Sequence, residues 1–353
     1  MDIFSGRLYT LPTNKQPNRA DKTLIKKILE KNGYEIPLKN LELVKVGEDY
    51  DLYFIKTEDK LYSLKLSFDP DNKSLKREMS FIKKAKIKSA PTFVSGGNVV
   101  VGDKLFYLLC EAAPSESITD YGLGAISGQF DKFLEDYSEL YNQSNNSYTF
   151  RKQTKDFVSS FNFQDLFGQD EIGYIQQSSD HKLCELIIAT IQKEILNLCK
   201  NLDHTFQNTI LGDVDLSYIF YDGVDFQFFD LKNSCVGHAF SDFINISLTL
   251  GLNKDAEKSL ITKACSKLNI AYDQSLFELL HSIELRKKAL KLFCNYLKEV
   301  YLYESQRIEE LFKLAQEFTA SYERYCKIPI VKENRQFIFK NITEPILEAS
   351  PKE

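Results

Sequence analysis

The sequence ILGDVD at residues 210–215, followed by FFDL at residues 228–231, decides the fold of this chain. Each stretch places a carboxylate at the end of an apolar run, Asp213 in the first and Asp230 in the second. Between them, two aromatic-rich runs flank Asp222-Gly223, a dipeptide that favours a tight hairpin turn. A short hairpin can bring the two carboxylates close together, and adjacent carboxylates repel unless a cation or a proton lies between them. The pair therefore predicts a divalent metal site and, with it, phosphate chemistry.

The composition is that of an ordinary soluble globular protein. The 353 residues are 43% hydrophobic and 27% charged, with a net charge of -5, so we expect no general nucleic-acid-binding surface. No apolar run reaches the roughly 18 residues that span a bilayer. The N-terminus lacks the basic start and apolar core of a secretion signal, and the seven cysteines form no CxxC pair. We therefore expect a cytoplasmic protein with buried thiols.

The chain changes character after its first third. Residues 1–37 are expected to form an N-terminal extension, and residues 38–112 a small β-rich lobe. Residues 113–330 carry apolar stripes at helical spacing and predict a larger helical lobe, followed by a C-terminal tail at 331–353. Within the β-rich lobe we expect strands at 41–46, 50–57, 61–67, 99–101 and 105–110, and one helix at about 73–85. The predicted class is α+β.

Three charged residues precede the two acidic stretches. Lys65 lies in the third strand-like run, Glu78 lies in the following helical segment, and Glu111 ends the last strand-like run. The order of these three residues, followed by Asp213 and Asp230, resembles the protein-kinase-like superfamily. The resemblance is to its aminoglycoside phosphotransferase and choline kinase branch. It implies a bilobal fold with a small β-rich N-lobe and a large helical C-lobe.

The resemblance implies a nucleotide site in the β-rich lobe. Lys65 resembles the strand lysine that holds the phosphates of ATP, and alternation along the strand sets it opposite its apolar neighbours. Glu78 resembles the helix glutamate that pairs with this lysine. The run that ends at Glu111 resembles the hinge, where backbone groups near Glu111 and Ala113 would hold the adenine edge.

The resemblance also assigns the two acidic stretches. Asp213 resembles the catalytic aspartate that accepts the proton of the attacking hydroxyl, and Asp230 resembles the Mg²⁺ ligand. The family has an asparagine ligand five residues after the catalytic aspartate, where this chain has Tyr218, and a phenol is a poor ligand for a hard cation. Asp215 is our candidate to replace that ligand. The first loop, at 46–51, is acidic where the family is glycine-rich.

These residues are compatible with three functions. The first is an ATP- and Mg²⁺-dependent phosphotransferase acting on a hydroxyl of a small molecule or glycan. The second is a pseudokinase, a nucleotide-binding scaffold on the same fold, suggested by Tyr218 and the acidic first loop. The third is a phosphatase or glycosyltransferase with an Asp213-x-Asp215 motif, which would require a parallel α/β sheet around that motif. The sequence leaves the acceptor and the oligomeric state open.

Overall fold

The computed structural model describes residues 22–36, 41–46, 50–57, 60–85, 87–112, 116–118, 128–144, 146–162, 181–202, 206–250 and 252–302. The chain divides into two compact units, unit 1 with residues 1–147 and 207–236, and unit 2 with residues 148–206 and 237–353. The segment with both acidic stretches therefore belongs to the same unit as the β-rich part of the chain. The predicted C-terminal tail lies outside the described residues, and the domain bounds inferred from the sequence stay a prediction.

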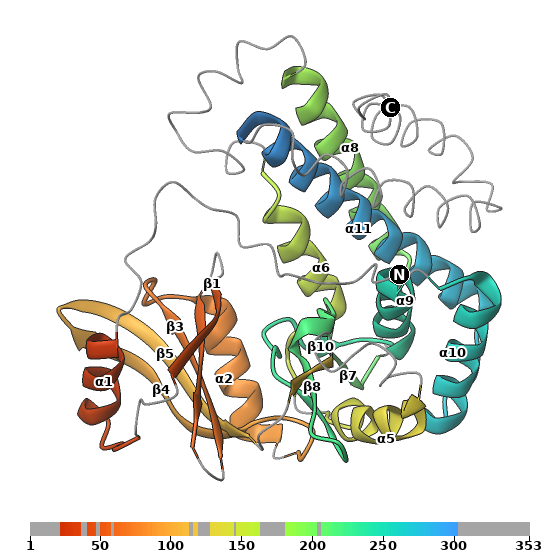
Figure 1. The fold of residues 1–353 in the computed structure, drawn as a ribbon. Helices are drawn as coiled ribbons and strands as arrows, with labels where there is room; N and C mark the ends of the chain where they lie inside the picture. Colours follow the sequence, from red (N-terminus) through yellow and green to blue (C-terminus); the bar gives the residue numbers. More distant parts are fainter. Residues whose placement is uncertain are drawn as a thin grey trace, which may run out of the picture. The chain divides into compact units, whose positions relative to one another are not determined.

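A five-stranded antiparallel sheet of order β1-β2-β3-β5-β4 frames unit 1 (Figure 1). Its strands are β1 (Leu41–Val46), β2 (Asp51–Lys56), β3 (Leu61–Ser67), β4 (Thr92–Val101) and β5 (Asp103–Ala112). Lys65 stands opposite Leu52 of β2 and Leu108 of β5, so its strand is central and its position is fixed from both sides.

Alternation along the strands separates two apolar clusters on the two faces of this sheet. Helix α1 (Lys22–Lys31) packs on one face, where Ile28 joins a cluster that includes Leu64 and Tyr107. Helix α2 (Lys73–Ala85) follows β3, and its Leu75 joins the cluster on the other face, which includes Leu52 and Phe54. Because Leu64 belongs to the α1 face, its neighbour Lys65 points to the face that α2 covers.

The two acidic stretches are carried by short elements of the same unit. These elements are β7 (Thr209–Ile210), the 3-10 turn η2 (Leu216–Tyr218), β8 (Ile219–Tyr221), β9 (Phe226–Phe228) and β10 (Cys235–Val236). Strands β8 and β9 form the predicted hairpin, and Gly223 supplies a φ of 99° in its turn. Strand β6 (Glu116–Ser117) pairs with β8, and helix α5 (Phe130–Tyr141) packs against β7 and β9.

Unit 2 consists of helices in its described part. They are α6 (Phe150–Ser159), α8 (His181–Lys200), α9 (Ala239–Leu250), α10 (Lys254–Leu268) and α11 (Gln274–Leu302). Helix α11 packs on α8 and α9, α10 packs on α9, and α6 packs on α8. Buried polar contacts tie these helices together: Arg286 lies 2.9 Å from Glu194, and Glu284 accepts a hydrogen bond from Ser241 at 2.6 Å.

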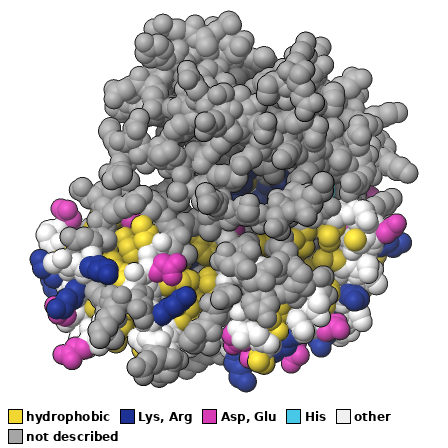
Figure 2. Space-filling model, in the orientation of Figure 1, with side chains coloured by type: hydrophobic (Ala, Val, Ile, Leu, Met, Phe, Trp, Pro, Cys, Tyr) yellow, Lys and Arg dark blue, Asp and Glu magenta, His cyan; other side chains and the backbone are white. Residues whose placement is uncertain are grey.

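The fold class is α+β, with a small antiparallel sheet in one part and helices in the other, as predicted. All described strand pairs are antiparallel, including the β7–β10 pair beside Asp213. The structure therefore gives no support to the parallel sheet that a phosphatase or glycosyltransferase would need. No helix in the described ranges is long and apolar enough to cross a membrane. Figure 2 shows Lys and Arg side chains interspersed with Asp and Glu on the face that it draws.

Candidate active site

Lys65 and Glu78 form a buried ion pair in unit 1. The Lys65 Nζ atom lies 2.7 Å from Glu78 Oε1 and 2.8 Å from Oε2, and the two side chains are 3% and 0% exposed. Burial raises the pKa of the Glu78 carboxyl, because a charged carboxylate loses its hydration there, while the Lys65 ammonium acts in the opposite direction. The lysine and glutamate that the family resemblance pairs are thus in direct contact.

The start of helix α2 holds Glu78 in reach of β3. Asn72 caps the helix, because its Oδ1 accepts hydrogen bonds from the backbone N–H of Leu75 and from the hydroxyl of Ser74. Its Nδ2 donates to Ser67 Oγ at the end of β3. The same side chain therefore fixes the helix start to the strand that carries Lys65.

The segment 226–231, which carries Asp230, is held by hydrogen bonds from several elements. Its donors are the N–H groups of Phe226 to Asp136 Oδ2 (2.8 Å), Phe228 to Ser89 O (2.8 Å), Phe229 to Tyr218 O (2.9 Å) and Leu231 to Glu78 Oε1 (3.1 Å). The carbonyl of Phe229 accepts a hydrogen bond from Lys65 Nζ at 2.9 Å. Partners on α5, η2, α2, β3 and the loop before β4 therefore fix the position of Asp230.

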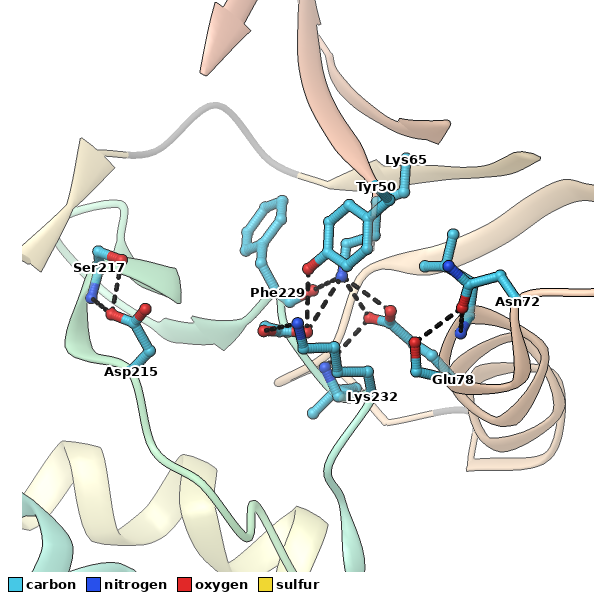
Figure 3. A network of polar contacts seen from close by, with 12 residues as sticks. Tyr50, Lys65, Asn72, Glu78, Asp215, Ser217, Phe229 and Lys232 are labelled. Carbon is cyan, nitrogen blue, oxygen red and sulfur yellow. Dashed lines mark hydrogen bonds and ion pairs between the residues drawn. The ribbon is translucent and has the colours of Figure 1, made fainter. Parts of the chain in front are cut away.

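Asp230 lies among Tyr50, Lys65 and Lys232, three residues that Figure 3 shows side by side. Its Oδ1 accepts a hydrogen bond from the Tyr50 hydroxyl at 3.2 Å and lies 3.5 Å from Lys65 Nζ. Its Oδ2 lies 3.9 Å from Lys232 Nζ. Both ammonium groups lie 4.9 Å from the centre of the Tyr50 ring, a distance at which the ring attracts cations. The arrangement neutralises the Asp230 carboxylate from two sides.

Gly212 brings the Asp213 loop against the Asp230 loop. It has a φ of 89°, and a Cβ atom on it would lie 2.3 Å from the carbonyl oxygen of Asn233, so only glycine fits without a shift. The contact lies next to the β7–β10 ladder and continues its register, in which Ile210 pairs with Cys235. Asp213 is partly buried in the loop after β7. The loop after β7 therefore lies against the chain segment that follows Asp230, and the close approach of Asp213 to Asp230 stays a prediction.

The comparisons with known proteins agree with this geometry. No protein-family model and no curated protein sequence matches the chain. Among solved structures, a thermostable mutant of the aminoglycoside phosphotransferase APH(4)-Ia, in complex with ADP and hygromycin B, is 9% identical, covers 84% of this chain and 96% of its own, and has a TM-score of 0.56. The amicoumacin kinase hAmiN, in complex with AMP-PNP, Ca²⁺ and Ami, is 10% identical, with coverages of 86% and 94% and a TM-score of 0.57. The chain has the protein-kinase-like fold of aminoglycoside phosphotransferases. At these identities the likeness establishes the fold alone.

A pair of tyrosines lies beside Asp230, and one of them, Tyr218, is the residue for which the sequence resemblance implies a metal-ligand position. The side chains of Tyr218 and Tyr50 are hydrogen-bonded to each other. The Tyr50 hydroxyl also donates a hydrogen bond to Asp230 Oδ1. Burial raises the pKa of both phenols, and the negative charge of Asp230 raises them further. Both phenols are therefore neutral at physiological pH. A neutral phenol is a weak ligand for Mg²⁺, so this side of Asp230 does not fit a second metal contact.

Asp215 is hydrogen-bonded to a neighbouring residue of its own loop. Its Oδ1 accepts hydrogen bonds from the N–H of Ser217 at 3.0 Å and from the Ser217 hydroxyl at 2.6 Å, which caps η2. Figure 3 shows the Asp215–Ser217 pair apart from Lys65, Glu78 and Lys232. The metal role of Asp215 stays a prediction, and Ser217 already engages its Oδ1.

The structure describes only part of the predicted hinge, the segment expected to hold the edge of the adenine ring. Glu111 lies in β5 and forms a half-exposed ion pair with Lys60 at 2.9 Å. Ala113 and the first loop at 47–49 lie outside the described residues. The adenine-binding role of Glu111 and Ala113 stays a prediction.

A single divalent cation fits the chemistry of the described site. Asp230 offers a carboxylate, the type of ligand that Mg²⁺ prefers. Within the described ranges, no group of three or more His, Cys, Asp or Glu side chains could hold a metal ion by itself. Further ligands could come from a bound phosphate, from water or from other oxygen atoms of the chain.

Sequence reasoning missed Tyr50, Lys232 and Asp136. Tyr50 stands in the loop–strand junction that was noted only for its acidic neighbours, and its contact to Asp230 spans 180 residues. Lys232 could have been found, because alternation after a strand places it on the same side as Asp230 two residues earlier. Asp136 looks like an ordinary surface residue of a helix until β9 is seen to donate to it.

Proposed function

We propose that the chain is an ATP- and Mg²⁺-dependent phosphotransferase that acts on a hydroxyl group of a small molecule or glycan. The observation that carries this proposal is the buried contact of Lys65 with Glu78 beside Asp230, with the Asp213 loop packed next to it through Gly212. The related folds of an aminoglycoside phosphotransferase and an amicoumacin kinase support the reaction class. The five described cysteines are buried free thiols, which agrees with the proposed cytoplasmic location.

Asp213 is the proposed catalytic base. It would orient the acceptor hydroxyl, and its carboxylate would take the proton as the acceptor oxygen forms a bond to the γ-phosphorus. The bond between that phosphorus and the bridging oxygen of ADP breaks in the same transfer, so ADP leaves with the electron pair. Positioning and charge neutralisation supply most of the rate in reactions of this kind.

Lys65 and Asp230 are the proposed phosphate and metal residues. Lys65 would place positive charge beside the phosphates, and Glu78 would keep its ammonium in position. Asp230 would hold one divalent cation, which supplies Lewis-acid neutralisation of phosphate charge when bound. The hydrogen bonds to the segment 226–231 would keep the Asp230 carboxylate at a fixed distance from Lys65.

A nucleotide-binding pseudokinase is the second candidate. Tyr218 in place of an amide ligand, together with the Tyr50 hydroxyl on Asp230, favours it. The two candidates differ in whether bound nucleotide is consumed. An enzyme should release ADP when an acceptor is present, whereas a pseudokinase should bind nucleotide without turnover.

The test measures ADP release by the purified chain against a panel of aminoglycosides, other amino sugars and simple glycans. We expect acceptor-dependent release that is lost in Asp213→Asn and Asp230→Asn, with melting temperatures close to that of the unaltered protein. Asp131→Asn is the matched control, because Asp131 is an exposed residue at the start of α5. Turnover that survives both site substitutions would overturn the assignment. Nucleotide binding without turnover on any acceptor would favour the pseudokinase.

A further inference from the structure

The three N–H donors of the Lys65 ammonium have acceptors inside the protein. An ammonium group has three N–H donors. Lys65 Nζ has three acceptors within 2.9 Å, the two carboxylate oxygens of Glu78 and the carbonyl of Phe229. Its side chain is only 3% exposed. A phosphate would have to displace one of these buried partners to receive a short hydrogen bond from Lys65.

Lys232 is the more accessible cation at the same carboxylate. Its Nζ lies 3.9 Å from Asp230 Oδ2, which is longer than a hydrogen bond, and its side chain is 23% exposed. Figure 3 shows its side chain beside Tyr50. The Tyr50 ring lies 4.9 Å from its ammonium, a distance at which the ring attracts a cation.

The position at which the family resemblance places a second metal ligand does not favour the binding of a second metal ion. Tyr218 occupies it, and its hydroxyl is hydrogen-bonded to Tyr50. The terminal phosphates of a nucleoside triphosphate carry several negative charges, and one divalent cation at Asp230 balances only part of them. A lysine 3.9 Å from Asp230 Oδ2 can supply positive charge that a second metal ion would otherwise supply.

We propose that Lys232 is a phosphate-binding residue that contacts the terminal phosphates of the nucleotide and takes the charge-neutralising role of a second metal ion. The inference rests on the proposed function, since it assumes that a nucleoside triphosphate binds beside Asp230. Lys232 follows Asp230, the proposed metal ligand, by two positions, and its ammonium faces Asp230 Oδ2. The site then uses one divalent cation and one lysine.

The test compares Lys232→Gln, Lys232→Arg and the full unaltered chain by calorimetric binding of three probes. The probes are a non-hydrolysable ATP analogue in Mg²⁺, the same analogue in EDTA, and adenosine, which has no phosphates. Lys104→Gln is the matched control, because Lys104 is an exposed lysine of the same unit. We expect Lys232→Gln to weaken binding of the analogue about tenfold in both buffers, a loss typical of one charge-assisted contact. Adenosine binding should be unchanged, and Lys232→Arg should retain most of the affinity.

The outcomes separate this inference from the function on which it rests. Equal affinity of the unaltered chain and Lys232→Gln for the analogue would overturn the role of Lys232 and leave the phosphotransferase proposal standing. An equal loss for adenosine would show that the substitution disturbs the fold of the site, and would also overturn the inference. If the unaltered chain binds neither the analogue nor adenosine, the proposed function falls and the inference falls with it.

Discussion

The ion pair between Lys65 and Glu78 predicts a large and non-additive loss of stability. We consider Lys65→Met and Glu78→Met, which replace each charged side chain by an unbranched apolar one, singly and together. Lys65→Met leaves Glu78 at 0% exposure with the Leu231 N–H as its remaining donor among the contacts described above. Glu78→Met leaves Lys65 with the Phe229 carbonyl and Asp230.

The magnitudes follow from burial. Removing one partner of a buried ion pair costs about 3–5 kcal/mol of unfolding free energy, because the other charge stays buried without compensation. Replacing both partners removes that penalty, so the double variant should lose about 2–6 kcal/mol, from the unpaired Phe229 carbonyl and Leu231 N–H at about 1–3 kcal/mol each. The sum of the two single losses of unfolding free energy should therefore exceed the loss in the double variant by several kcal/mol.

The assay is equilibrium unfolding in urea followed by circular dichroism, with Lys104→Met as an exposed control. A pH series adds a second readout. Burial raises the pKa of Glu78, and Lys65→Met removes the main opposing charge, so the folded variant holds a proton that the unfolded chain releases above its own pKa. The unfolding free energy of Lys65→Met should therefore rise, relative to the unaltered protein, as the pH falls from 8 to 5. Additive single losses, or a Lys65→Met loss below about 1 kcal/mol, would refute the reasoning.

Three further predictions concern other positions. Gly212→Ala should lower the melting temperature more than Gly223→Ala. Both glycines have left-handed φ values, 89° and 99°, which cost about 1–2 kcal/mol in each alanine variant, but only Gly212 lies against a carbonyl. Equal losses of stability in the two variants would contradict the close approach at Gly212. Burial lowers the pKa of His238 to about 4, and its Nδ1 accepts a backbone N–H. The unfolded chain therefore takes up this proton first, and the unfolding free energy should fall by about 1.6 kcal/mol more in the unaltered protein than in His238→Gln between pH 6.5 and 5. A parallel pH dependence of the two would contradict it. Burial raises the pKa of Cys110 to about 12, so an alkylating reagent at pH 8 should leave Cys110 unlabelled in native protein, as peptide mass spectrometry would show, and label it in urea.

The sequence was sufficient to predict the frame of the site. The strands at 41–46 and 61–67 and the helix at 73–85 have the predicted bounds, because their apolar residues follow one clear period each. Strand β4 begins earlier than predicted, at Thr92, because Gly96 and Gly97 hide its alternation. Lys65, Glu78 and Asp230 occur in the same order as in the family that the sequence resembles. This order was enough to predict that the three residues lie close together.

The details that decide activity could not be predicted in the same way. Whether Asp215 turns toward a metal or toward Ser217 depends on the local geometry of a three-residue turn, which no periodic pattern records. The Tyr50 contact to Asp230 depends on where a loop ends in space. Neither contact has a signature in sequence spacing, since each joins irregular segments whose conformation is set by the surrounding fold.

The hydrogen bonds that hold segment 226–231 have a consequence for the speed of recognition. Asp136, Ser89, Tyr218 and Glu78 already fix its backbone before any substrate arrives. A carboxylate held in this way needs little ordering when a cation reaches it, so little of the binding free energy is used to freeze the segment. Metal capture at Asp230 should then follow a single kinetic phase, at a rate governed by encounter and by the release of the Tyr50 hydroxyl.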